Sequence, residues 1–214
     1  MYFLSIATPK RCVIITALLV IQLVLAECSA QSLNGVRIGD SASTLQALNL
    51  QQISRVGEAG MKVTKFKLPN GNELSVTYDS RADRILYIEN DWNLTSQSNA
   101  VGSSNLVFGS TNLKDIRKMY GSNGFSWKTV FMQRSGNELI MFNAYEIRKK
   151  RNGVVVFVTS VDVEEYHSAG ADSKLVPKLA RLQAVIVADE RYLDAIWGEE
   201  KIYDGVSRPI SWKD

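Results

Sequence analysis

Short runs of alternating apolar and polar residues fill the middle of the chain, and turn residues separate them. The first two runs cover residues 63–68 and 74–78, with an Asn-Gly turn at 70–71. A period of two is typical of a strand that buries one face, and Asn-Gly favours a hairpin. A third run at 85–88 follows a polar turn. This part of the chain therefore predicts an antiparallel meander with one apolar face.

The same order of signals returns in the second half of the chain. Strand-like runs lie at 127–132, 139–145 and 154–161, and the sequence Gly-Asn-Glu-Leu of 71–74 recurs at 136–139. The glycines of the two copies are expected at equivalent hairpin turns with positive φ, which glycine adopts without strain. The recurrence indicates a duplicated unit.

A glycine followed by a short helix-like stretch precedes each meander. After Gly39, residues 40–43 supply an aspartate and two serines that suit the N-cap of a helix. After Gly109, Ser110 or Thr111 can cap a second helix, whose leucine, isoleucine and tyrosine fall on one stripe. Each meander is therefore expected to begin with a helix.

Together these patterns predict an α+β fold of two tandem units, each a helix followed by an antiparallel meander. The first unit spans 31–93 and the second 105–161, and a linker rich in serine and asparagine covers 94–104. Residues 51–60 are polar and contain glycine, so they are expected to be a connection. Residues 162–214 form a C-terminal extension with strand and helix signals.

The second meander differs from the first because it is apolar on both faces. Ile140 and Phe142 stand where the first unit has Ser75 and Thr77, and residues 154–158 are almost entirely valine. A strand that is apolar on both sides is normally covered on both sides.

The C-terminal extension is the expected cover for the second face. Residues 182–188 form a further strand-like run, and Asp189 can cap a helix that carries Leu193 and Trp197. The extension is therefore predicted to pack on the second unit.

The first thirty residues have the composition of a secretory signal peptide. Lys10 and Arg11 precede an apolar run at 12–26, and small residues lead to Ala30. Cleavage after Ala30 removes both cysteines of the chain and predicts a periplasmic or secreted protein, bacterial rather than animal. Two alternatives stay open, namely an uncleaved membrane anchor and a lipoprotein acylated at Cys28. No later stretch is apolar enough to span a bilayer.

The two glycine-to-helix openings and the two Gly-Asn-Glu-Leu turns give the chain a resemblance to a known architecture. The layout resembles the β-lactamase-inhibitory-protein-like architecture, and it is similar to small outer-membrane-assembly lipoproteins that carry one such unit. The resemblance covers roughly residues 33–161. Members are mostly exported and bind other proteins without catalysis, which is what the resemblance implies for this chain.

Charge adds little to this picture, since the formal net charge is +3. The longest basic run is Arg-Lys-Lys-Arg at 148–151, and Asn-Gly follows it between two strand-like segments. The favoured interpretation is a solvated hairpin tip, ahead of an anionic-surface or nucleic-acid site. No nucleic-acid partner is expected.

One set of residues suggests catalysis. The Gly-Asp-Ser of 39–41 resembles the nucleophile block of the Gly-Asp-Ser esterases, and Glu164 with His167 resembles their acid–histidine pair. His167 is the one histidine of the chain, so any Ser–His pair must use it. Helix capping accounts for Ser41 and for Ser110 together and is the favoured interpretation. A serine hydrolase that uses Ser41, Glu164 and His167 is the alternative function.

No residue pattern predicts a metal or a cofactor. One histidine and two cysteines, both before residue 31, make a poor ligand set, and the phosphate-binding and dinucleotide motifs are missing. A polar loop after a strand accounts for the glutamates beside the histidine. We therefore expect no cofactor and no metal site.

Four aromatic residues near the unit boundaries are the candidates for partner binding, because tryptophan and tyrosine are enriched at protein interfaces. They are Trp92, Tyr120, Phe125 and Trp127. Core packing is the alternative role of each. The sequence thus predicts an exported, non-enzymatic binding or inhibitory protein of the cell envelope, whose partner is another exported or envelope protein.

Overall fold

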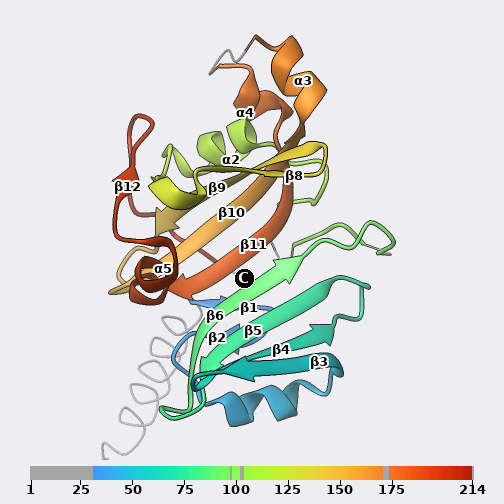
Figure 1. Ribbon diagram of the computed structural model, residues 1–214, viewed down its shortest axis with the longest axis vertical. Helices are drawn as coiled ribbons and strands as arrows, with labels where there is room; N and C mark the ends of the chain where they lie inside the picture. Colours follow the sequence, from blue (N-terminus) through green and yellow to red (C-terminus); the bar gives the residue numbers. More distant parts are fainter. Residues whose placement is uncertain (1–30, 97, 102–103, 171–173, 214) are drawn as a thin grey trace, which may run out of the picture.

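The computed structural model describes residues 31–96, 98–101, 104–170 and 174–213. The predicted signal peptide, residues 1–30, lies outside these described residues. The main element is one eight-stranded antiparallel sheet (Figure 1). Its strands, in their order across the sheet, are β3 (Gln51–Glu58), β4 (Met61–Lys67), β5 (Glu73–Asp79), β6 (Arg84–Asp91), β11 (Arg181–Asp189), β10 (Gly153–Asp162), β9 (Glu138–Glu146) and β8 (Met132–Ser135).

Two short ribbons and several short helices pack on the sheet. The ribbons pair β1 (Ser32–Leu33) with β2 (Val36–Arg37), and β7 (Ser126–Trp127) with β12 (Lys201–Ile202). The helical segments are η1 (Ala42–Leu48), α2 (Leu113–Tyr120), η2 (Lys128–Val130), α3 (Val163–Ser168), α4 (Val176–Leu179) and α5 (Glu190–Trp197). None of these described helices exceeds eight residues.

The expected α+β fold of two tandem helix-and-meander units is wrong, because the protein is mainly β and its strands join in one sheet. β3 to β6 form one meander and β8 to β11 form another, and β6 pairs with β11 in the middle. The pairing runs from Tyr87 opposite Ala188 to Asp91 opposite Ala184. Backbone hydrogen bonds therefore cross the boundary at which the sequence suggested two separate sheets.

The segment expected as a connection at 51–60 contains a strand. All eight residues of β3 are exposed, and β3 is an edge strand with a partner only on its β4 side. A strand without a buried face has no reason to alternate apolar and polar residues. The polar composition of this segment therefore reflects its edge position.

The two Gly-Asn-Glu-Leu copies lie at turns with positive φ, as expected, but the turns are not equivalent. Gly71 has φ +93° and joins β4 to β5, which lie inside the sheet. Gly136 has φ +59° and joins the edge strand β8 to β9. The turns also differ in length. The four matching residues therefore suit a turn at both places. They do not show that β4 and β5 correspond to β8 and β9 in a repeat.

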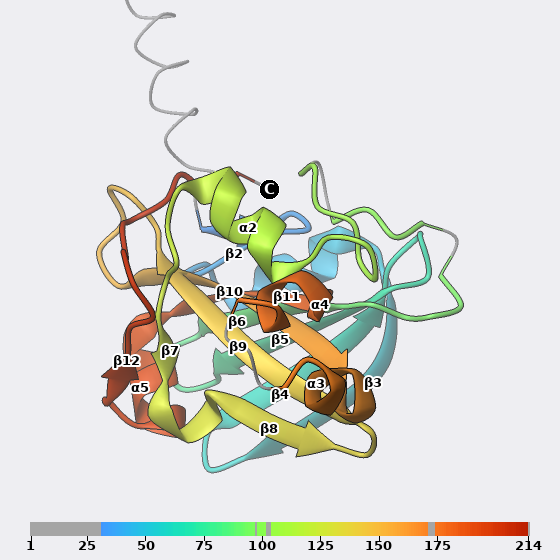
Figure 2. The ribbon, with the colours of Figure 1, turned by 90° about the horizontal axis from the view of Figure 1, so that it is seen from above.

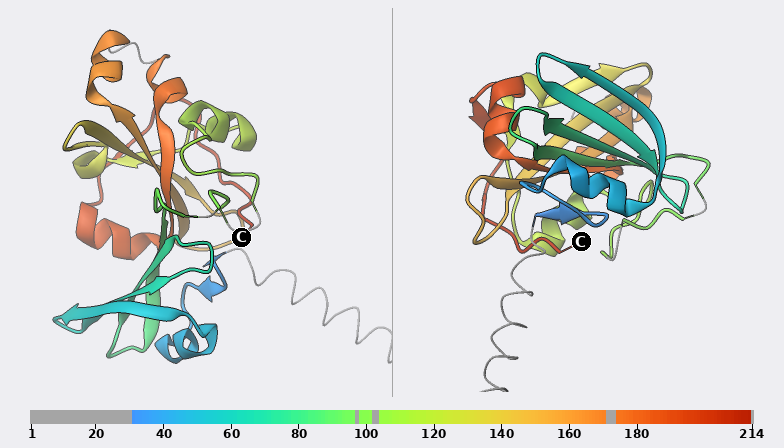
Figure 3. Two further views of the ribbon diagram at one scale, coloured as in Figure 1. Left: turned by 90° about the vertical axis from the view of Figure 1, so that its right-hand side faces the viewer. Right: turned by 90° about the horizontal axis from the view of Figure 1, so that it is seen from below.

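The sheet buries apolar side chains on two faces. The first face carries Leu74, Val76 and Phe157, and β1, β2, η1 and the C-terminal Trp212 cover it. The second face carries Val156 and Ile186, and α5 with β7 covers its β9–β11 half. Figure 3 shows α2 and α5 on opposite sides of the sheet.

The C-terminal extension contributes β11 to the middle of the sheet and α5 to the cover of its second face. Val154 to Val158 of β10 are buried on both faces, and Leu193 of α5 is completely buried against the second one. The rings of Phe142 and Trp197 meet edge to face with centroids 5.4 Å apart. Asp189 caps α5 by accepting a hydrogen bond from the backbone N–H of Arg191, as the sequence predicts.

The helix before the second meander begins later than expected. Asn112 is the N-cap of α2 and accepts from the N–H of Asp115, whereas Ser110 or Thr111 was the expected cap. Gly121 ends the helix in the left-handed region. Thr111 instead accepts a hydrogen bond from the N–H of Val107 and so holds the preceding loop.

Leu193→Ala should lower the free energy of unfolding by about 2–5 kcal/mol, because it leaves a cavity between α5 and the second face. Urea denaturation measures this change. Ile196→Ala on the same helix is the matched control, since Ile196 is 49% exposed. The control should shift stability by less than about 1 kcal/mol. Equal effects of the two substitutions would contradict the packing of α5 as described.

Candidate functional site

An apolar cavity of about 190 Å³ opens at the β8–β9 edge of the sheet. Segments far apart in the chain meet there, since α2, α3 and α4 lie at this end of the molecule with β7 and β12 (Figures 1 and 2). The apolar walls are Leu113, Phe125, Phe131, Met132, Met141, Phe142, Tyr166, Val176, Pro177 and Ile202. We call this space the edge cavity.

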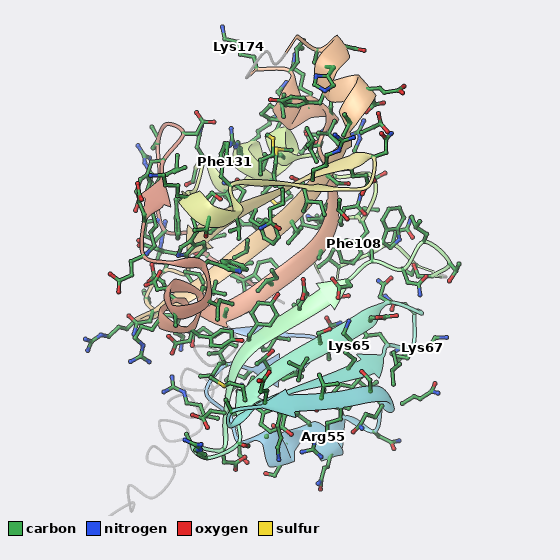
Figure 4. The ribbon with its side chains drawn as sticks, viewed as in Figure 1. Arg55, Lys65, Lys67, Phe108, Phe131 and Lys174 are labelled. Atoms are coloured by element: carbon green, nitrogen blue, oxygen red, sulfur yellow. The ribbon has the colours of Figure 1, made fainter. Side chains whose placement is uncertain are left out.

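Two hydrophobic residues of the edge cavity stay in contact with water. Phe131 is 44% exposed and Ile202 is 36% exposed. Phe131 follows η2, a short turn that separates β7 from β8, and Figure 4 shows its place near α2 and β9. Exposed apolar residues around an opening are typical of a site that receives another molecule.

Arg117 and Asp204 are the charged residues on the wall of the edge cavity. Arg117 lies one helical turn after Leu113 on α2, so both side chains lie on the same side of the helix. Its Nη1 donates to Asp204 Oδ2 at 3.1 Å. Its Nε is buried and has no hydrogen-bond acceptor among the described residues. A buried guanidinium donor without an acceptor favours a ligand that brings an oxygen atom.

Two asparagines on the wall of the edge cavity form hydrogen bonds. Asn143 donates from Nδ2 to the carbonyl of Asn123 at 2.9 Å, and its Oδ1 accepts from the Tyr145 hydroxyl at 2.9 Å. Asn123 also donates its backbone N–H to the carbonyl of Val206. These bonds fix the wall between β9 and the segment after β12, so the cavity is held open by protein contacts.

A second polar feature lies on the β4–β6 half of the second face, where Ser75 is buried. Lys65, Ser75 and Glu89 are cross-strand neighbours on β4, β5 and β6, and Asp91 lies two residues beyond Glu89 on the same face. Lys65 is visible on β4 in Figure 4. The Ser75 hydroxyl is buried and has no hydrogen-bond partner in the described part of the chain. We call Glu89 and Asp91 the carboxyl pair.

Burial, and after it the neighbouring charge of Asp91, raise the pKa of Glu89 to about 7. The Tyr87 hydroxyl donates to Glu89 Oε2 at 2.8 Å, which opposes this rise. Burial also raises the pKa of Asp91, while Lys65 lowers it. The carboxyl pair therefore holds a proton at a pH where isolated carboxyl groups have lost it.

The structure does not bring the predicted hydrolase residues together. Ser41 is the N-cap of η1, accepts from the N–H of Ser43 and donates to Asp83. Glu164 and His167 belong to α3, which replaces the polar loop expected there. η1 and α3 lie at opposite ends of the long axis of the molecule (Figure 1). We therefore do not propose a hydrolase.

The four aromatic candidates have different surroundings, and one of them reaches the edge cavity. Phe125 is buried and lines that cavity. Trp127 is completely buried and donates from Nε1 to Asp194. Tyr120 stacks on Phe157 with centroids 5.7 Å apart.

Trp92, the fourth candidate, belongs to the packing around the first face. Its Nε1 donates to Asn99 Oδ1 at 3.3 Å, and its ring lies directly over Gly109. A Cβ atom at Gly109 would come within 2.4 Å of the ring, so glycine is required there for the approach. This contact gives the glycine before α2 a packing role.

Arg117 and Phe131 were not identified from the sequence. Arg117 falls on the helix that the sequence predicts, four residues after Leu113, so its position beside an apolar stripe was a usable signal. Phe131 was placed inside a strand expected at 127–132, where an apolar residue suggests core. η2 interrupts that strand and turns Phe131 toward water.

Comparisons with known proteins give a limited result. No protein-family model matches the chain. No curated protein matches it either. Among solved structures, the chain is similar to a cysteine-rich secretory protein from Staphylococcus aureus, with 12% identity and a TM-score of 0.45. The match covers 83% of this chain and 51% of the staphylococcal one, so this chain spans about half the length of that protein.

No helix within the described ranges is long and apolar enough to cross a bilayer. Among the same residues, no group of three or more histidine, cysteine, aspartate or glutamate side chains is placed to hold a metal ion.

Stability should fall as the pH rises from about 4.5 to about 7, because the folded protein keeps the Glu89 proton that the unfolded chain releases in this window. Glu89→Gln removes this titration and should flatten the decline, which urea denaturation at a series of pH values measures. Glu58→Gln on the exposed strand β3 is the control and should keep the slope of the unaltered protein. Parallel curves for all three proteins would contradict the raised pKa of Glu89.

Proposed function

We propose that this protein is an exported binding protein that receives an apolar side chain of another protein in the edge cavity. The observation that carries the proposal is the combination of an open apolar cavity with Arg117, whose Nε has no acceptor among the described residues. An apolar side chain fits the walls, and the backbone carbonyl beside it supplies the acceptor for Arg117. Well-packed pockets that take one anchor residue dominate the energetics of many protein interfaces.

The chemistry of the lining supports capture of a polypeptide. Phe125, Phe131 and Phe142 offer aromatic surface for a bulky side chain, and the methionines adapt to its shape. Phe131 and Ile202 extend the apolar surface to the outside, so residues on either side of the anchor also find contacts. These features support binding of a polypeptide in the edge cavity. Neither Ser41 nor His167 takes part in it.

The location outside the cytoplasm is part of the same proposal. It rests on the N-terminal pattern of two basic residues, an apolar run at 12–26 and small residues before Gln31. The partner is then a protein of the same compartment.

A peptide library displayed on phage and selected against the chain from Gln31 tests the proposal. Selected peptides should share an aromatic or large aliphatic residue. Phe131→Asp should weaken their binding at least about tenfold, because it places a charge at the rim, and Arg117→Met should weaken it about tenfold through the lost hydrogen bond.

Val56→Asp is the matched control, since Val56 is 64% exposed but lies on β3, away from the edge cavity. It should leave the affinity unchanged. Peptides that bind all four proteins equally, or a selection that yields no apolar anchor, would contradict the proposed function.

A further inference from the structure

The hairpin between β9 and β10 carries four consecutive basic residues on a well-defined turn. The N–H of Ile147 donates to the carbonyl of Gly153 at 2.8 Å, and Lys149 and Asn152 adopt φ values of +63° and +58°. The C-terminal tail supports the hairpin from the side, since the N–H of Arg148 donates to the carbonyl of Ile210. Figure 2 shows the tail, in red, passing beside the hairpin, in gold. We call residues 148–151 the basic tip.

The positive charge of the basic tip is not neutralised within the described residues. None of its four side chains forms an ion pair there. Two glutamates border the same open hollow: Glu190 is already paired with Lys201, and the exposed Glu146 forms no ion pair with the basic tip. The side chain of Arg148 donates to the backbone carbonyl of Pro209, which carries no net charge. The basic tip therefore presents up to four cations that are available to an anionic partner.

The start of the described chain lies at the base of this hairpin. The side chain of Gln31 packs against Gly153 so closely that a Cβ atom there would lie 2.0 Å from its amide nitrogen. Trp212 Nε1 donates to the carbonyl of Ser32 at 3.0 Å, which fixes the segment next to the tail. The exit point of the N-terminal segment and the basic tip are therefore on the same part of the surface.

The sequence before Gln31 limits how far this part of the surface can lie from a membrane. The apolar run ends at Ala26, and four residues separate it from Gln31. Even a fully extended chain of this length reaches only about 15–18 Å. While the apolar run is in a membrane, or if Cys28 carries a lipid, Gln31 and the hairpin beside it must stay close to the lipid headgroups.

We infer that the basic tip binds the anionic headgroups of the membrane through which the chain is exported. This surface is distinct from the edge cavity, and the inference rests on the export of the chain that the proposed function includes. The sequence alone favoured a solvated tip. The structure adds the unpaired charge and the position of Gln31, and both favour a negatively charged lipid surface as the partner. Each basic residue held near such a surface strengthens binding by about fivefold.

Co-sedimentation with lipid vesicles tests this inference. The protein is the chain from Gln31, which contains every core residue described above. The probes are phosphatidylcholine vesicles with and without phosphatidylglycerol, at low and at high salt. The protein should bind the vesicles that contain phosphatidylglycerol, should not bind pure phosphatidylcholine, and should be released by salt.

The variant K149Q/K150Q/R151Q should bind the anionic vesicles about a hundredfold more weakly, because three charges near the surface are lost. It keeps Arg148, whose backbone and side chain hold the tail. The variant K62Q/K67Q/K114Q removes the same charge elsewhere and should change binding by less than about threefold. Both should keep the thermal midpoint of the unaltered protein, since these side chains lie at the surface.

Three results would overturn the inference. The first is equal binding of the two triple variants, which would show only a response to net charge. The second is binding to phosphatidylcholine alone. The third is binding to duplex DNA as tight as to anionic vesicles and lost in the same variant, which would make the tip a general polyanion site.

Discussion

The pairing of β6 with β11 is the interaction on which the rest of the structure depends. Each strand belongs to a different meander, and their five residue pairs make one sheet out of two. β11 is apolar on both faces, so it needs a neighbour on each edge and a cover on each side. The middle of the sheet supplies two neighbouring strands and two covered faces, and β11 lies there between β6 and β10.

The two faces of this sheet are covered by different elements. The first face is sealed along its length by the N-terminal ribbon, η1 and the tail. On the second face α5 and β7 pack over β9 to β11, and the β4–β6 half carries the carboxyl pair, Lys65 and the buried Ser75. The edge cavity forms where the cover ends at β8 and β9.

Much of the sheet could be predicted from the sequence, and its assembly could not. Alternation located β4 and β5, and the doubly apolar runs located β10 and β11, because burial leaves a direct trace in residue type. The sequence of β3 shows no alternation of apolar and polar residues, because this exposed edge strand has no face to bury. The pairing of β6 with β11 joins segments far apart in the chain, and no local pattern encodes it. Of the predicted site residues only Phe125 lines the edge cavity. Arg117 and Phe131 also line it, and they were not predicted because only tertiary contacts bring them there.

Native-state hydrogen exchange tests the central claim that the two meanders form one cooperative sheet. The account predicts that the slowest amides of β5 and β6 and those of β10 and β11 exchange with one common opening free energy, because neither half keeps its buried edge alone. The edge strands β3 and β8 should exchange faster. Two separate levels, with β4 to β6 opening independently of β9 to β11, would show that the meanders are individual units and would contradict the account.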